Sequence, residues 1–89
     1  MIAENDPTIE ANFQRVLGLI RAQGVEQWTE GKIGAPDLPG LIYLCKFGFM
    51  TAVLTKGQIA QILGLDRAEL RAMVKGWYDD HRRKGCGAC

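Results

Sequence analysis

Two groups of residues in this 89-residue sequence have types and spacings that suit binding or redox chemistry. Arg67, Arg71 and Lys75 recur every four residues, so on a helix they share one cationic stripe. Such a stripe suits phosphates and the hydrogen-bonding edges of bases. Cys86 and Cys89 are separated by two residues, a spacing found in metal sites and in redox dithiols.

The pair formed by Cys86 and Cys89 leaves several interpretations open. It could form half of a zinc site, hold a softer metal or cycle as a dithiol, and the basic residues 82–84 would favour thiolate. A structural zinc site takes four ligands, which leaves His81 and Cys45 as further candidates. Cys45 falls on an apolar stripe that predicts a buried side chain, whereas His81 is expected to be exposed. A frayed terminus without a cofactor is the plainer alternative.

Residues for common enzymatic chemistry do not occur in suitable combinations. The sequence has no serine, its one histidine has no nucleophile or orienting acid nearby, and its glycines form no phosphate-binding loop. A chain of 89 residues also has little room for an enclosed substrate cavity. We therefore do not expect an enzyme.

Helices must position the residues named above. Capping residues, turn glycines and apolar residues at helical spacing predict helices at 7–23, 37–53, 56–63 and 67–83. The last two begin with capping boxes at 55–58 and 66–69, and Gly64 separates them. The expected fold class is all-α, a small four-helix domain over residues 1–85 with a cysteine-containing tail at 86–89.

The apolar stripes also predict a core. Trp28, in the loop after the first helix, is expected to close over that core. The other residues expected to be buried are Phe13, Val16, Ile20, Ile42, Cys45, Phe49, Ile59, Leu63, Leu70 and Met73. The helix at 37–53 is apolar nearly all round. One short chain is not expected to cover that much apolar surface, which predicts a homodimer through the first two helices.

The stretch 56–75 resembles the helix-turn-helix of bacterial transcription regulators. The matching positions are an apolar and a small residue in the first helix, an apolar–glycine–apolar turn and two inward apolar residues in the second helix: Ile59, Ala60, Leu63, Gly64, Leu65, Leu70 and Met73. The resemblance implies DNA binding, with Arg67 and Arg71 contacting bases. It further implies that Lys75, Lys56 and Gln58 hold phosphates.

Charge gives this interpretation modest help and leaves another open. Residues 55–89 hold seven Lys or Arg against four Asp or Glu, a net charge of +3, whereas residues 1–54 have a net charge of −2. Asp79 and Asp80 interrupt the basic half, and strong nucleic-acid binders usually carry more positive charge. A helical adaptor that docks on a protein partner is therefore one alternative to a DNA-binding regulator. A thiol-dependent sensor or metal carrier that uses Cys86 and Cys89 is the other.

Composition predicts a globular cytoplasmic protein. Apolar residues make up 47% of the sequence and charged residues 24%. The start is polar and acidic, unlike a secretory leader, and the longest apolar stretch, 38–54, is interrupted and shorter than the roughly 20 residues of a membrane helix. We therefore expect no membrane partner.

Overall fold

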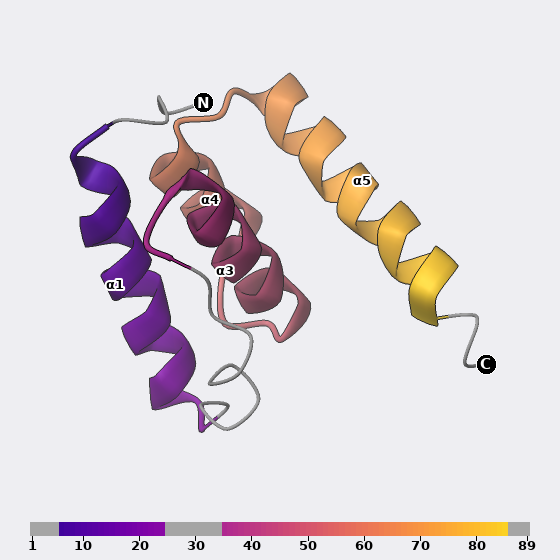
Figure 1. The fold of residues 1–89 in the computed structure, drawn as a ribbon. Coiled ribbons are helices and arrows are strands. Elements are labelled where there is room, and N and C mark those ends of the chain that lie inside the picture. Colours follow the sequence, from indigo (N-terminus) through magenta and orange to yellow (C-terminus); the bar gives the residue numbers. More distant parts are fainter. Residues whose placement is uncertain (1–5, 25–34, 86–89) are drawn as a thin grey trace.

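The computed structural model describes residues 6–24 and 35–85, with side chains as far as Arg82. Within these residues the chain is all-α, with helices α1 (Thr8–Ala22), α3 (Leu38–Met50), α4 (Lys56–Leu63) and α5 (Arg67–Gly85) (Figure 1). The predicted all-α class and the four predicted helices are confirmed, with bounds that differ by three residues at most. None of the helices in this part of the chain has the length and apolar character to cross a membrane. Trp28, Cys86 and Cys89 lie outside the described residues.

Both capping boxes predicted for the C-terminal half are present. The Thr55 N–H donates to Gln58 Oε1 at 2.8 Å, and the Gln58 N–H donates to Thr55 Oγ1 at 3.2 Å. Asp66 and Glu69 make the equivalent pair of hydrogen bonds, at 3.0 and 2.7 Å. Gly64 ends α4 in the left-handed conformation, with φ at 65°. These caps leave three residues, 64–66, to link α4 to α5.

Helix α3 ends three residues before its predicted end because the backbone turns at Ala52. This alanine adopts a left-handed conformation with φ at 62°, which only glycine accepts without strain. The Val53 and Leu54 N–H groups then donate to the Gly48 carbonyl, at 2.7 and 3.0 Å. The apolar sequence continues past Met50, so the hydrophobic pattern alone could not locate this end.

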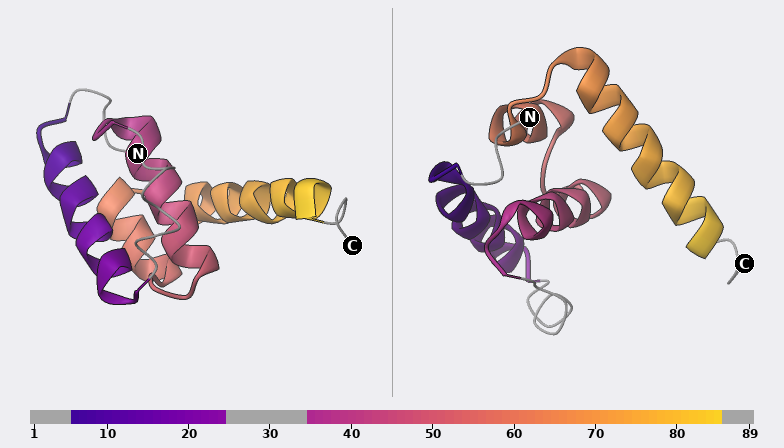
Figure 2. Two further views of the ribbon diagram at one scale, coloured as in Figure 1. Left: turned by 60° about the horizontal axis from the view of Figure 1, so that its bottom comes forward. Right: turned by 45° about the horizontal axis from the view of Figure 1, so that its top comes forward.

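The core lies between α1, α3 and α4. Six of the ten residues predicted to be buried are buried, among them Phe13, Cys45 and Leu63. The other four, Ile42, Phe49, Leu70 and Met73, are only partly buried and pack at its edge. For Leu70 and Met73 the cause is the position of α5, which runs beside the other helices and projects beyond them (Figure 2). An edge helix of this kind has packing neighbours on one side only.

Helix α5 is attached to α3 by an aromatic contact and an ion pair. Trp77 is buried, and its ring centroid lies 6.0 Å from that of Phe49, which also meets Tyr78 edge-on at 5.9 Å. Lys46 Nζ lies 2.9 Å from Asp80 Oδ2, and both side chains are about 30% exposed. A partly exposed ion pair contributes at most about 1 kcal/mol, whereas removing a buried tryptophan side chain costs about 3–5 kcal/mol. Trp77 is therefore the main anchor of α5.

Ala52→Gly is expected to stabilise the fold. Glycine removes the steric cost of a left-handed alanine, and we expect the free energy of unfolding to rise by about 1 kcal/mol. Ala72→Gly is a matched control, because Ala72 is exposed within α5, where glycine destabilises by about 0.5–1 kcal/mol. Urea unfolding followed by circular dichroism measures both. A loss of stability in Ala52→Gly equal to that in Ala72→Gly would show that the turn at Ala52 is not formed.

Candidate nucleic-acid interface

Three of the predicted DNA-binding residues come together between α4 and α5. Lys56 is the first residue of α4, and Arg67 and Arg71 lie one turn apart at the start of α5. Together with Leu70 and Val74 they line an open hollow of about 260 Å³. We call these three cations the basic cluster and this cavity the α4–α5 hollow. The three cations are exposed, which leaves them accessible to a ligand.

The rotation of α5 about its axis places the two arginines at the hollow. Val74 and Trp77 are buried, so the face of α5 that carries them is turned toward the other helices. Arg67 and Arg71 precede Val74 by seven and three residues, which puts them on the flank next to that face. The buried residues of α5 thus direct its first cations toward the N-terminus of α4.

The basic cluster has no acidic counterpart among the described residues that line the hollow. The two nearest acids in sequence, Asp66 and Glu69, accept backbone hydrogen bonds from each other in the capping box. In the described part of the chain, no hydrogen bond or ion pair engages the Lys56, Arg67 or Arg71 side chain. Their positive charge is therefore available to an external anion.

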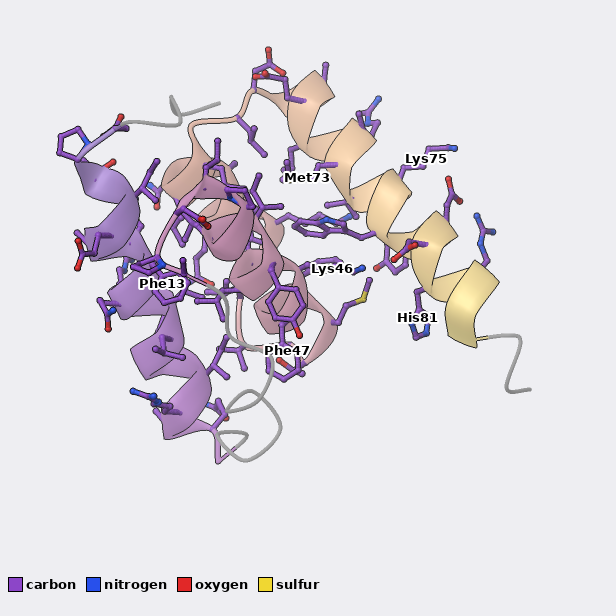
Figure 3. All side chains as sticks on the ribbon, in the orientation of Figure 1. Phe13, Lys46, Phe47, Met73, Lys75 and His81 are labelled. Atoms are coloured by element: carbon purple, nitrogen blue, oxygen red, sulfur yellow. The ribbon has the colours of Figure 1, made fainter. Side chains whose placement is uncertain are left out.

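The other two predicted contact residues are engaged elsewhere. Lys75 points away from the other helices (Figure 3), and its Nζ lies 3.1 Å from Asp79 Oδ2. Arg82 pairs with the same carboxylate, and hydrogen bonds from Lys75 and then Arg82 lower the pKa of Asp79. Gln58 uses its side-chain oxygen in the cap of α4. The predicted stripe is thus divided into an unpaired cluster at the start of α5 and a neutralised group farther along.

A second hollow, of about 340 Å³, lies where α3 meets the later part of α5. Three aromatic or apolar side chains of α3 and three polar side chains line it: Tyr43, Phe47 and Met50, and Lys46, Thr51 and His81. His81 is exposed, as expected, and Figure 3 shows it on the same helix as Lys75. This hollow thus combines an apolar and aromatic surface with a lysine, a threonine and a histidine.

Cys45 does not join a metal-binding group among the described residues. It is buried, as predicted, and burial raises the pKa of its thiol to about 12. The thiol therefore stays protonated at neutral pH and is a poor ligand and a poor nucleophile. Residues 6–24 and 35–85 contain no cluster of three His, Cys, Asp or Glu side chains that could hold a metal ion.

Sequence reasoning missed the apolar part of the hollow and the anchor of α5. Leu70 was expected to be buried, but it lines the α4–α5 hollow, and Val74 and Trp77 were not singled out. The spacing of residues 70, 74 and 77 fits one helical face and could have identified both. The ion pair of Lys46 with Asp80 joins residues 34 positions apart and has no such local signal.

In comparisons with known proteins, no protein-family model, no curated protein and no solved structure matches this chain. The case for a function is therefore built on the chain's own residues. The α4–α5 hollow presents exposed positive charge beside a small apolar surface. This arrangement can bind an anion.

Proposed function

We propose that this protein binds DNA through the basic cluster of Lys56, Arg67 and Arg71, and acts as a small transcription regulator. The observation that supports the proposal most is the convergence of three exposed cations from two helices on one hollow, with no acidic side chain among the described residues that line it. Binding to DNA is driven largely by neutralising phosphates and releasing their counterions. A cluster of unpaired cations supplies this driving force, whereas a cation already paired with a carboxylate contributes less.

In this proposal α4 and α5 act as a helix-turn-helix, with α5 as the helix that enters the major groove. Three features support this role. The link of three residues contains Gly64 in the left-handed conformation, and the Leu65 N–H donates to the Ala60 carbonyl at 2.9 Å. Ile59 and Leu63, on the inner face of α4, are fully buried. The first turns of α5 also remain exposed, as a helix needs if its N-terminal residues are to contact DNA.

Removing the basic cluster is expected to abolish most DNA binding. In the triple variant Lys56→Ala, Arg67→Ala, Arg71→Ala, the affinity should fall by at least a hundredfold at low salt, because several charge-assisted hydrogen bonds to DNA are lost. The dependence of log K on log salt should flatten by about 0.9 for each lost phosphate contact. Titration of a fluorescent duplex at two salt concentrations measures both quantities.

The matched control is Arg15→Ala, which removes one exposed positive charge from α1. Helix α1 lies on the opposite side of the molecule from α5 in every view (Figures 1 and 2). This variant should bind DNA almost as the unmodified protein does. If the unmodified protein fails to bind any duplex at low salt, or if the triple variant binds no more weakly than the control, the proposal is wrong.

Binding of a protein partner is a second candidate, and the hollow beside His81 favours it. Tyr43 and Phe47 are half-buried there, and Met50 is 37% exposed, so apolar surface remains accessible on α3. The homodimer expected from the sequence would also use apolar residues of α3. However, α1, α4 and α5 cover much of α3, whose Leu41, Leu44 and Cys45 are fully buried within the chain. The apolar character of α3 is therefore largely explained without a second copy.

The homodimer stays a prediction with a direct test. Light scattering under reducing conditions should give twice the mass of one chain at micromolar concentrations if apolar residues of α1 and α3 form the interface. Met50→Lys, which places a charge on the exposed apolar surface, should then return the mass to that of a monomer. A monomeric mass for the unmodified protein across this range would show that the chain covers α3 by itself.

A further inference from the structure

The α4–α5 hollow brings three like charges to one small space. Lys56 reaches it from α4, and Arg67 and Arg71 reach it from α5. Like charges around one concavity repel each other, and a bound anion relieves that repulsion. Because the described residues that line the hollow include no acidic side chain, an anion bound there would supply the compensating charge.

The size and lining of the hollow restrict the kind of anion. Its volume of about 260 Å³ is below the roughly 300–1,000 Å³ of sites that enclose a drug-sized ligand, so it suits a small group. Leu70 and Val74 add an apolar surface beside the cations. A phosphate group with an attached sugar matches both parts, since its oxygens accept from the cations and its carbon atoms can pack on the apolar residues.

A phosphate fits the charge of the cluster better than a base edge does. A guanine offers two acceptor atoms in the major groove, and the fork of one arginine satisfies both. Three cations around one hollow exceed what an uncharged base can use. A phosphate carries net charge and accepts several charge-assisted hydrogen bonds at once, and arginine can bind it through two parallel N–H groups. The three side chains can therefore share one phosphate.

We propose that the α4–α5 hollow is a phosphate-binding site in which Lys56, Arg67 and Arg71 hold one phosphate group and Leu70 and Val74 contact the sugar attached to it. This inference rests on the proposed function where the phosphate belongs to DNA, while a free phosphate ester offers the same chemistry. It changes the role of the two arginines. They position the protein on the DNA backbone, and other residues on the exposed face of α5 contact the bases.

Duplex DNA tests the role of each cation. Lys56→Ala, Arg67→Ala and Arg71→Ala are titrated separately against a duplex obtained by selection and against a scrambled duplex of equal length. Each variant should lose roughly tenfold in affinity, and the loss should be equal for both duplexes, because a phosphate contact carries no sequence information. If Arg67→Ala or Arg71→Ala reduces the difference in affinity between the two duplexes, that arginine contacts bases and the shared phosphate site is wrong.

Inorganic phosphate tests the site without DNA. Phosphate added to the full chain should shift the amide NMR signals of residues 56, 67 and 71, and sodium chloride of equal ionic strength should not. Arg71→Ala should abolish the shifts, whereas Lys75→Ala should keep them, because Lys75 is paired with Asp79 and does not line the hollow. The spectra also report whether each variant is folded.

The two probes separate this inference from the proposed function. Phosphate-induced shifts without binding to either duplex would keep the phosphate site, assign it to a free phosphate compound and remove the DNA proposal. Equal losses on both duplexes without phosphate-induced shifts would keep the site and assign it to the phosphodiester of DNA. Unchanged duplex affinities in the three variants, together with unchanged NMR signals, would overturn the phosphate site.

Discussion

The burial of Trp77 is the interaction on which the rest of this structure depends. Helix α5 is 19 residues long and lies at the side of the molecule, so few side chains decide where it sits and how it is rotated. Trp77 packs against Phe49 of α3, and the Lys46–Asp80 ion pair fixes the same stretch of helix. Because the face of Trp77 and Val74 is turned inward, the flank with Arg67 and Arg71 faces the start of α4.

This placement explains why cations with similar sequence positions differ in chemistry. Arg67 and Arg71 lie beside Lys56 with no carboxylate among the described lining residues. Lys75, one turn farther along, instead meets Asp79, which Arg82 also neutralises. Among the side chains of α5 that the structure describes, the unpaired positive charge therefore lies at the start of the helix.

The sequence predicts the helices well because their boundaries have local causes. The capping boxes at Thr55 and Asp66 and the left-handed Gly64 each involve residues within a few positions of one another. Both boxes, and the break between the two helices at Gly64, were predicted. The early end of α3 was missed because Ala52 occupies a conformation that its residue type does not favour. The hydrophobic pattern runs past that turn, so only tertiary packing, with Leu54 buried, fixes it.

The candidate site was only partly predictable, because it depends on how two helices are rotated relative to each other. Spacing placed Arg67, Arg71 and Lys75 on one stripe, but it could not show that the first two join Lys56 while the third pairs with Asp79. The side-chain oxygen of Gln58, which was assigned to phosphate binding, serves the cap of α4, so only its amide N–H groups could donate to a phosphate. Such a division of roles is visible only when the partners of each side chain are known.

The central claim is that cations from α4 and α5 form one anion-binding site. A double-mutant cycle in DNA affinity tests it directly, using Lys56→Ala, Arg71→Ala and the double variant. Groups that share a ligand couple by roughly 0.5–3 kcal/mol, whereas independent groups add to within about 0.5 kcal/mol. We predict clear coupling between Lys56 and Arg71. In a second cycle, in which Lys75→Ala replaces Arg71→Ala, we predict additive effects. Additive effects in both cycles would contradict a shared site.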